Sequence, residues 1–319
     1  MRSIPTTMRA AAIDHFGRPE VLKIHTLPVP KYNAQEVLIA VDTAGVGIWD
    51  LSHRDGSSAE RKKFPLVLGT DGAGVVVAVG SRVRHLAVGD RVYSYSYENP
   101  KGGFYAEYVV VAAGKVARVP KGLDLIAAGA IPTIGLTALQ GVDDDTLGIE
   151  KGESVIIHGA SGNVGMLALQ FAKQRGARVL ATASGKDGIA LVRRLGADEA
   201  VDGKRSDILK AAHRFAPDGV DAVLAFVGGK ELTRCLDALR KGGRFAYPNG
   251  IEPEPKKRRG LKMKSYDGVA APPQFERLGR AIAEGLQIPI AEVFPLKKAA
   301  QAHRRLEKGH VLGKIVLRI

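Results

Sequence analysis

The chain has 319 residues, 45% of them hydrophobic, which is enough for about two domains with sizeable cores. Its 47 Lys and Arg against 33 Asp and Glu give a net charge of +14, which favours anionic partners in general without choosing among them. The single cysteine, Cys235, excludes an intrachain disulfide and a multi-cysteine metal site and fits a reducing cytoplasm. No basic head with an apolar run opens the sequence, so we expect no signal peptide.

The first third of the chain has the period of β-strands rather than helices. Short apolar runs alternate with glycine- and proline-rich turns, which is typical of a mostly antiparallel β domain with few helices. The strands are expected at 8–13, 21–25, 36–43, 74–79, 91–94 and 106–111.

An uncharged stretch, 125–142, follows this β region and approaches the length of a membrane span. It contains Gly129, Pro132, Gly135 and Gly141, which interrupt a long apolar helix. A buried connector between two domains is the better interpretation.

Residues 153–165 predict a strand, a glycine-rich turn and the start of a helix. Ser154 to Ile157 form the apolar strand, and an apolar-periodic helix runs from about Asn163 to Arg175. The turn has the spacing of a dinucleotide-binding fingerprint, with Ala160 in place of its first glycine. Such a turn binds a pyrophosphate, because small residues allow close approach and the helix N-terminus offers free N–H groups.

Strands and helices then alternate, which predicts a parallel sheet covered on both faces, the doubly wound α/β fold. Ligands of this fold bind at the carboxyl ends of the strands. The expected strands are 178–182, 199–201, 220–226 and 244–247, and the expected helices are 187–195, 206–215 and 230–240.

The end of the second strand of this series bears on the choice of cofactor. An NAD site needs a carboxylate there for the ribose 2′-hydroxyl, and none stands at this strand end. Ser184 can instead donate to a 2′-phosphate and Lys186 can neutralise it. NADP is therefore expected rather than NAD. Alternatively, Ser184 and Asp187 serve only to cap the next helix.

The C-terminal part begins with a polar loop, 251–260, whose basic run Lys256 to Arg259 invites a nucleic-acid interpretation. A solvated loop is the more common role of such a run. A strand is expected at 261–266, helices at 273–285 and 297–308, and a last strand near the C-terminus.

Several ordered motifs together resemble the medium-chain dehydrogenases/reductases, and among them the zinc-free quinone oxidoreductases of the zeta-crystallin-like group. The resemblance covers residues 8–319 and rests on the segments 45–50, 65–74, 88–92, 102–108 and 135–138 and the glycine turn. It implies a discontinuous GroES-like catalytic domain (1–125 and 267–319), a Rossmann-type NADP-binding domain (126–266) and a homodimer formed through the sixth strand.

The resemblance also implies the cofactor contacts. Thr133 and Thr137 should approach the nicotinamide or the diphosphate, and residues ending later strands should pass the ribose, adenine and nicotinamide. With the turn and the expected phosphate contacts, the predicted set is Thr133, Thr137, Ala160, Ser161, Gly162, Asn163, Val164, Gly165, Ser184, Lys186, Phe226, Val227, Gly228 and Asn249.

Zinc-dependent relatives carry a cysteine where this chain has Gly47, and Gly-His-Glu where it has Gly69-Thr70-Asp71. Zinc needs converging Cys, His or carboxylate ligands, and no structural four-cysteine lobe exists here. We expect neither a catalytic nor a structural zinc.

Without a Lewis acid, the expected hydride acceptors are quinones and the C=C bonds of α,β-unsaturated carbonyls, which already delocalise an incoming hydride. Similar quinone reductases place an asparagine and a tyrosine where this chain has Gly47 and Ser52. Trp49, Asp50 and Ser52 are the candidate catalytic residues, and Phe104 and Tyr105 are expected beside the nicotinamide. The competing hypotheses are a non-catalytic NADPH-binding sensor, a nucleic-acid-binding protein, or a zinc-free NADP-dependent alcohol dehydrogenase.

Overall fold

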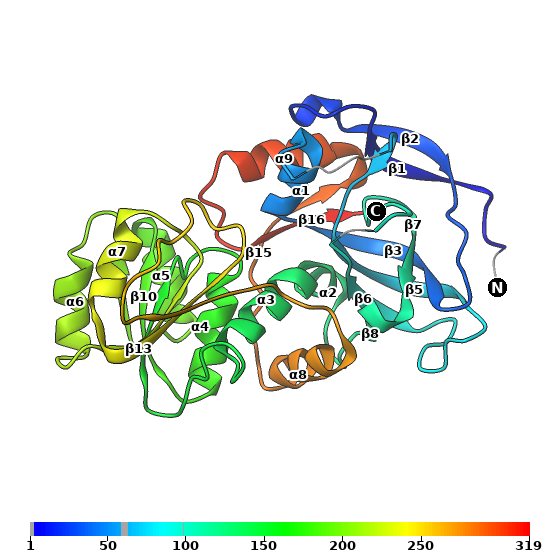
Figure 1. Cartoon of the computed structure of the whole chain (residues 1–319). Helices are drawn as coiled ribbons and strands as arrows, with labels where there is room; N and C mark the ends of the chain where they lie inside the picture. The colour runs from blue at the N-terminus through cyan, green and yellow to red at the C-terminus, as the bar shows by residue number, and fades with distance from the viewer. Residues whose placement is uncertain (1–2, 59–62, 98) are drawn as a thin grey trace. The chain divides into compact units, whose positions relative to one another are not determined.

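A computed structural model describes residues 3–58, 63–97 and 99–319 (Figure 1). The chain divides into two compact units. Unit 1 comprises Met1–Thr133, Ala270–Gly279 and Ile288–Ile319, and unit 2 comprises Ile134–Val269 and Arg280–Gln287.

Unit 1 is built from two β-sheets. The larger has the order β15-β16-β3-β5-β6-β8, with β7 also paired to β3, and the smaller has the order β2-β1-β4. Its pairs are antiparallel except for β15 with β16, so the predicted mostly antiparallel domain is confirmed. The strands are β1 (Thr7–Ile13), β2 (Lys23–Pro28), β3 (Glu36–Val46), β4 (Leu66–Val67), β5 (Asp71–Val79), β6 (Arg91–Tyr95), β7 (Tyr108–Ala112), β8 (Val116–Arg118), β15 (Ile290–Pro295) and β16 (Lys314–Arg318).

Helix α1 (Ile48–Asp55) was not predicted. It starts because the Asp50 carboxylate accepts a hydrogen bond from the backbone N–H of Gly47, and it ends at Gly56, whose φ of 88° closes the last turn. A strand expected at 21–25 was shifted, because Pro19 starts a 3-10 turn instead. The other helical segments of unit 1 are η1 (Pro19–Val21), η2 (Ala113–Lys115), α2 (Leu125–Ala130), η3 (Leu296–Lys298) and α9 (Ala299–Glu307).

The uncharged stretch at 125–142 forms α2 and then α3 (Pro132–Val142), with a break at Ile131. Pro132 opens α3, where a missing N–H costs nothing. Helix α8 (Pro272–Ala283) completes the chain's helical elements outside the series described below. Within the described residues, no helix combines the length and apolar character needed to cross a bilayer.

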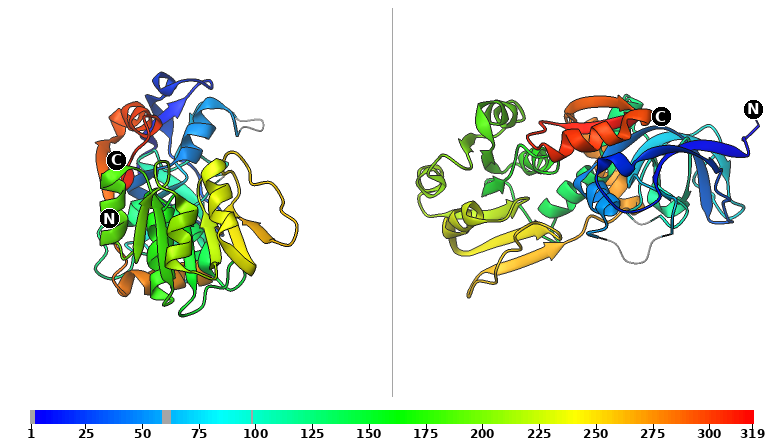
Figure 2. Two further views of the ribbon diagram at one scale, coloured as in Figure 1. Left: turned by 90° about the vertical axis from the view of Figure 1, so that its left-hand side faces the viewer. Right: turned by 90° about the horizontal axis from the view of Figure 1, so that it is seen from above.

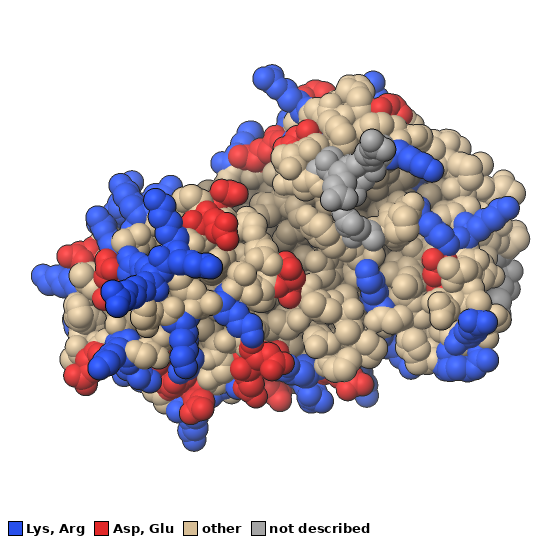
Figure 3. All heavy atoms as spheres, in the orientation of Figure 1, with Lys and Arg blue, Asp and Glu red and all other residues tan. Residues whose placement is uncertain are grey.

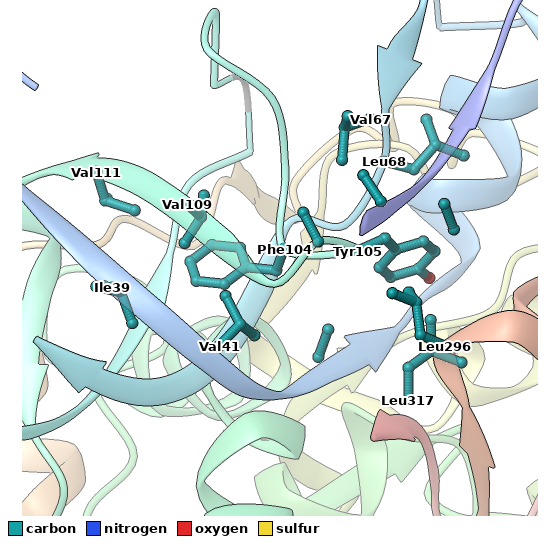
Figure 4. Close-up of a cluster of buried hydrophobic side chains, with 14 of the residues drawn as sticks. Ile39, Val41, Val67, Leu68, Phe104, Tyr105, Val109, Val111, Leu296 and Leu317 are labelled. Atoms are coloured by element: carbon teal, nitrogen blue, oxygen red, sulfur yellow. The ribbon is translucent and has the colours of Figure 1, made fainter. Parts of the chain in front are cut away.

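The core of unit 1 surrounds Phe104 and Tyr105, both fully buried (Figure 4). Their backbone N–H groups donate to the carbonyl oxygens of Gly69 and Leu68, both at 2.9 Å. A Cβ on Gly103 would collide with those same two carbonyl oxygens, so glycine is required for this close approach. The segment that carries the two aromatic rings is therefore fixed against residues 68–70. Aliphatic side chains surround the two rings: Ile39, Val41, Val67, Val109, Val111, Leu296 and Leu317.

Unit 2 is a parallel sheet with the order β11-β10-β9-β12-β13-β14 and helices on both faces (Figure 2). This is the doubly wound order, in which the first strand is central and the topology reverses beside it. The predicted Rossmann-type fold is confirmed. The strands are β9 (Ser154–His158), β10 (Arg178–Ala183), β11 (Glu199–Asp202), β12 (Val220–Ala225), β13 (Leu239–Pro248) and β14 (Lys262–Tyr266), and the helices are α4 (Gly165–Gln174), α5 (Gly185–Arg194), α6 (Ile208–Phe215) and α7 (Lys230–Asp237).

Element boundaries in unit 2 follow from local contacts. Every residue of β9 is buried, as expected of a strand covered on both faces. Helix α7 stops at Asp237, earlier than the predicted Arg240, because β13 already begins at Leu239 and pairs with Val220. Cys235 lies in α7 and is fully buried.

Candidate functional site

The glycine turn of unit 2 has little room on its inner side. A Cβ on Gly165 would collide with the Gly159 carbonyl oxygen, so the start of α4 packs directly on the turn. At Gly162, by contrast, the nearest heavy atom to an added Cβ is that same oxygen at 3.3 Å, and the residue is exposed. The first N–H groups of a helix have no partner within the helix. The turn therefore fits the pyrophosphate of a dinucleotide, which Gly162 would face.

Loops from the neighbouring strands converge on this turn. The Ser161 hydroxyl accepts a hydrogen bond from the N–H of Ser184, which follows β10, at 3.2 Å. From the end of β12, the Phe226 N–H donates to the His158 carbonyl at 3.0 Å, and Val227 lies beside Gly159. The predicted turn residues and the ends of β10 and β12 thus lie together at the carboxyl edge of the sheet.

Ser184 and Lys186 are both exposed at the start of α5. Ser184 occupies the N-cap position, but its side chain makes no capping hydrogen bond. Ser184 therefore does not cap α5 through its hydroxyl, contrary to the alternative role suggested by the sequence. Both side chains remain able to reach an anion.

Asp202 is a carboxylate near this site that the sequence pattern did not indicate. It ends β11 beside Ala183 of β10, and its Oδ2 accepts a hydrogen bond from the Gly185 N–H at 3.2 Å. Its Oδ1 accepts from the N–H groups of Lys204 and Arg205, at 2.9 and 3.1 Å. These backbone hydrogen bonds, the one from Lys204 foremost, hold the pKa of Asp202 below its usual range. The residues at the end of β10 do not reveal it, because it is parallel pairing that brings the end of β11 to the same place.

The other residues predicted to contact the cofactor make hydrogen bonds within their own unit. The exposed Asn249 amide donates to Asp267 at 2.9 Å, and the Thr137 carbonyl accepts from the Tyr266 hydroxyl at 3.0 Å. Thr133 belongs to unit 1, where its N–H donates to Asp71 at 3.0 Å. Its own hydroxyl is buried without a hydrogen-bond partner among the described residues.

Unit 1 contains a buried group of charges. Asp50, Asp71 and Lys314 are each fully buried. The strand registers explain their proximity, because Ala44 of β3 pairs with Gly72 of β5, and Val46 pairs with Ile315 of β16. Asp71 and Lys314 thus flank the end of β3. A Cβ on Gly45 would collide with the Asp71 carboxylate and lie 2.9 Å from the Lys314 side chain, so only glycine leaves space between them.

The two carboxylates are unusual acids because water cannot solvate their charges. Burial, and then the neighbouring Asp71, raises the pKa of Asp50 to about 7. Burial likewise raises the pKa of Asp71, and the Lys314 ammonium opposes that rise. Lys314 also lies over the Trp49 ring, with its Nζ 4.7 Å from the ring centroid.

A chain of hydrogen bonds leads to Asp50. Arginine can only donate, so the Arg54 guanidinium, 3.3 Å from His303 Nδ1, makes that nitrogen the acceptor. The proton then lies on His303 Nε2, which is 3.2 Å from the Tyr105 hydroxyl. Tyr105 in turn donates to Asp50 at 3.4 Å. Burial, and then the Arg54 charge, lowers the pKa of His303 to about 3, so the ring is neutral.

Tyr105 was expected beside the nicotinamide, together with Phe104. The structure corrects this interpretation, because Phe104 is a core side chain of unit 1 and Tyr105 belongs to the chain of hydrogen bonds beneath Asp50. Both rings are fully buried, which the flanking double glycine did not indicate.

Trp49 covers Gly47. A Cβ on Gly47 would collide with the indole ring, so a side chain at 47 and this position of the ring exclude each other. Ser52, in contrast, lies within α1, where its hydroxyl donates to the Ile48 carbonyl at 3.4 Å. Of the three candidate catalytic residues, Asp50 belongs to the buried group of charges, the half-buried Trp49 contacts that group through Lys314, and Ser52 does neither.

Several buried polar atoms of this region have no hydrogen-bond partner among the described residues. Such atoms are rare in folded proteins, and they mark places where water or a ligand is bound. They are Trp49 Nε1, Asp50 Oδ1, Thr70 Oγ1, Asp71 Oδ1, Thr133 Oγ1 and Lys314 Nζ.

A cavity of about 860 Å³ opens in unit 1 beside this region. The His53 and Tyr97 rings meet in its wall edge to face, with centroids 4.9 Å apart. Trp49, Asp50 and Ser52 are not among the described residues of the wall, whereas Thr70 is. Across the described residues, no group of three His, Cys, Asp or Glu side chains is placed to hold a metal ion.

The raised pKa of Asp50 predicts how stability depends on pH. The folded protein keeps a proton on Asp50 that the unfolded chain loses near pH 3.8, so the free energy of unfolding should fall as the pH rises from about 4 to about 7. A shift of this size corresponds to about 4 kcal/mol. Asp50→Asn, which keeps an acceptor for the Gly47 N–H, should remove this loss.

Urea unfolding of both proteins at pH 5 and pH 8 measures the effect. The wild type should lose more stability between these pH values than Asp50→Asn does. An equal loss in both proteins would show that Asp50 is ionised throughout.

Comparison with known proteins adds the family. Residues 33–121 match the alcohol dehydrogenase GroES-like domain, and residues 195–317 match the zinc-binding dehydrogenase domain. A quinone oxidoreductase of Sus scrofa is 33% identical, with 97% of each chain covered. A crystal structure of an NAD-dependent alcohol dehydrogenase is 34% identical with a TM-score of 0.91, covering 98% of this chain and all of the other. A mycobacterial protein in complex with NADPH is 26% identical with a TM-score of 0.86, at the same coverage. The protein therefore belongs to the medium-chain dehydrogenase/reductase family, in its quinone oxidoreductase branch.

Proposed function

We propose that the protein is an NADPH-dependent oxidoreductase that transfers a hydride, without zinc, to a quinone or to the C=C bond of an α,β-unsaturated carbonyl. The observation that carries this proposal is the similarity over 97% of the chain to a quinone oxidoreductase. The glycine turn of unit 2 supports it, because its geometry fits a dinucleotide.

The chemistry divides between the cofactor and the protein. A bound nicotinamide supplies the hydride, and the protein positions the acceptor, excludes water and stabilises the charge that develops. A quinone or an enone accepts hydride as a delocalised anion, so it needs a hydrogen bond rather than a Lewis acid. The cavity of unit 1, with a wall that includes the His53 and Tyr97 rings, suits a flat conjugated acceptor.

The geometry around Gly47 supports a reaction without zinc. Two ligand positions of the zinc-dependent relatives are Gly47 and Thr70 in this chain, and neither offers a zinc ligand. The Trp49 ring also takes the space that a side chain at 47 would need. The name of the matching dehydrogenase domain thus describes other members better than this chain.

Charge at the end of β10 supports NADPH over NADH. Ser184 and Lys186 are exposed and make no competing contact in a helix cap. Asp202 stands nearby, but its oxygens already accept three backbone hydrogen bonds, so it is poorly placed to hold a ribose 2′-hydroxyl. Lys and Arg side chains also gather over the part of unit 2 that carries α5, α6 and α7 (Figure 3). A 2′-phosphate would meet a favourable field there.

A zinc-free alcohol dehydrogenase is the second candidate, favoured by the similarity to an NAD-dependent alcohol dehydrogenase. We also propose a homodimer, because β14 is an edge strand whose outer side has no neighbouring strand among the described residues. The single cysteine supports a location in the reducing cytoplasm. A nucleic-acid partner is not part of the proposal.

A substrate panel tests the reaction. Purified protein should oxidise NADPH with a quinone or an alkenal and not with a saturated aldehyde, and a strong chelator should leave the rate unchanged. Turnover with the aldehyde would favour the alcohol dehydrogenase, and loss of activity on chelation would contradict the metal-free site. Saturable NADPH binding with no turnover would favour a binding protein or sensor.

The cofactor preference has its own test in Lys186→Glu. Reversing this charge should weaken NADPH binding by about tenfold or more relative to NADH, since one charge-assisted contact contributes about 1.5–3 kcal/mol. Lys241→Glu, which changes an exposed lysine at the opposite end of the strands, is the matched control. Fluorescence titration with both cofactors gives the ratio of dissociation constants. An unchanged ratio in Lys186→Glu would refute the assignment of the 2′-phosphate site.

A further inference from the structure

Thr70 has a side chain without an evident structural role. The residue is 1% exposed, and its Oγ1 is buried without a hydrogen-bond partner among the described residues. A buried hydroxyl in that state costs about 1–3 kcal/mol. Thr70 also forms part of the wall of the 860 Å³ cavity of unit 1. A donor without a protein partner, in a residue of the cavity wall, is a candidate partner for a molecule bound in that cavity.

The backbone holds Thr70 in a fixed position. Its carbonyl accepts a hydrogen bond from the Ser96 N–H at 2.8 Å, and the Gly69 carbonyl accepts one from the Phe104 N–H at 2.9 Å. Gly69 has a φ of 101°, and a Cβ there would lie 2.8 Å from the Tyr105 backbone nitrogen. The hydroxyl is therefore carried by a rigid segment, which is what preorganised stabilisation of charge requires.

Two other polar side chains of the cavity wall, Lys101 and Asn99, are already engaged. The Lys101 ammonium binds the Lys31 carbonyl and the Glu36 carboxylate, at 2.9 and 2.5 Å. The Asn99 amide donates to the Val110 carbonyl at 2.7 Å. Using either group for a ligand would first break a hydrogen bond, whereas the Thr70 hydroxyl has none to lose.

We propose that Thr70 is a catalytic residue whose hydroxyl donates a hydrogen bond to the carbonyl oxygen of the quinone or enone as that oxygen becomes negative. This inference rests on the proposed function and adds a residue to it. The hydride forms a C–H bond at the electrophilic carbon, and the π electrons of the acceptor move to its oxygen. The nicotinamide is left oxidised. Water then supplies the proton that completes the saturated carbonyl. With a quinone, water protonates one oxygen and also carries a proton from the reduced ring carbon to the other oxygen as the ring becomes aromatic. Thr70 keeps its own proton throughout.

The expected size of the effect follows from comparable donors. Removing one hydrogen bond to a developing oxyanion typically lowers kcat by about 10²–10³-fold. Because the negative charge exists mainly in the transition state, the loss should fall on kcat rather than on the KM of the acceptor or on NADPH binding.

Thr70→Val removes the hydroxyl and nearly preserves the shape, and Thr70→Ser retains the hydroxyl. Thr70→Val should lose about 10²–10³-fold in kcat with either class of acceptor. The kcat of Thr70→Ser should stay within about tenfold of the wild-type value. The difference in kcat between the Ser and Val variants then separates loss of the hydrogen bond from loss of packing. Thr70→Ala is a second variant that lacks the hydroxyl and should match Thr70→Val. Wild-type kcat in a folded Thr70→Val or Thr70→Ala protein would overturn the proposal.

Binding of 4-nitrophenol gives a readout that does not depend on turnover. Its phenolate resembles the anion of the reduced acceptor, and its absorbance reports its ionisation. The wild type should lower the pKa of the bound phenol more than Thr70→Val does. Equal shifts in the two proteins would contradict the role of Thr70. Absence of NADPH oxidation by the wild type, together with a shift that depends on Thr70, would contradict the proposed reaction while supporting the anion site.

Discussion

The burial of two carboxylates and an ammonium in unit 1 is the constraint on which the rest of that unit depends. Asp50, Asp71 and Lys314 come from α1, β5 and β16, elements far apart in the sequence, and none reaches water. Charges in such a place are tolerated only when they compensate each other and are hydrogen-bonded. The Gly47 N–H, the Thr133 N–H and the Tyr105 hydroxyl bind only the Oδ2 atom of each carboxyl group. The raised pKa of Asp50 removes one of the charges below about pH 7. The glycine at position 45 follows from the same need, because a side chain there would collide with Asp71 and lie too close to Lys314.

Unit 2 meets a different requirement with small residues. Close packing of α4 on the turn leaves the pyrophosphate side open, and Asp202 ties the loop after β10 to the loop after β11. A carboxylate in this position would ordinarily argue for NADH. Here its oxygens already accept hydrogen bonds from backbone N–H groups, so its main effect is to hold the backbone of Lys204 and Arg205 close to that of Gly185. The presence of a carboxylate at this strand end is therefore not enough to predict the cofactor. The hydrogen bonds that the carboxylate already accepts must also be considered.

Much of the fold could be predicted because periodicity and turn residues are local properties. The parallel sheet and the glycine turn followed from alternating strands and helices. Helix α1 was missed because its start depends on a single contact between Asp50 and Gly47, and its eight residues lack a long apolar period. Asp202 and Thr70 were missed as site residues for another reason. Their importance comes from neighbours on other strands, Gly185 in one case and the cavity wall in the other, and no spacing in the sequence encodes these. Likewise, the double glycine before Phe104 signalled a close approach, but not that the ring would be buried in the core.

The reaction proposed for this protein is conjugate hydride transfer from a nicotinamide in a site without zinc. It can be tested by supplying NADPH deuterated at the transferred position on C4, together with an enone, and locating the deuterium in the product by mass spectrometry and NMR. We expect a saturated carbonyl product with deuterium on the β-carbon. Deuterium on the carbonyl carbon of an alcohol product would contradict it and would identify the protein as a carbonyl reductase.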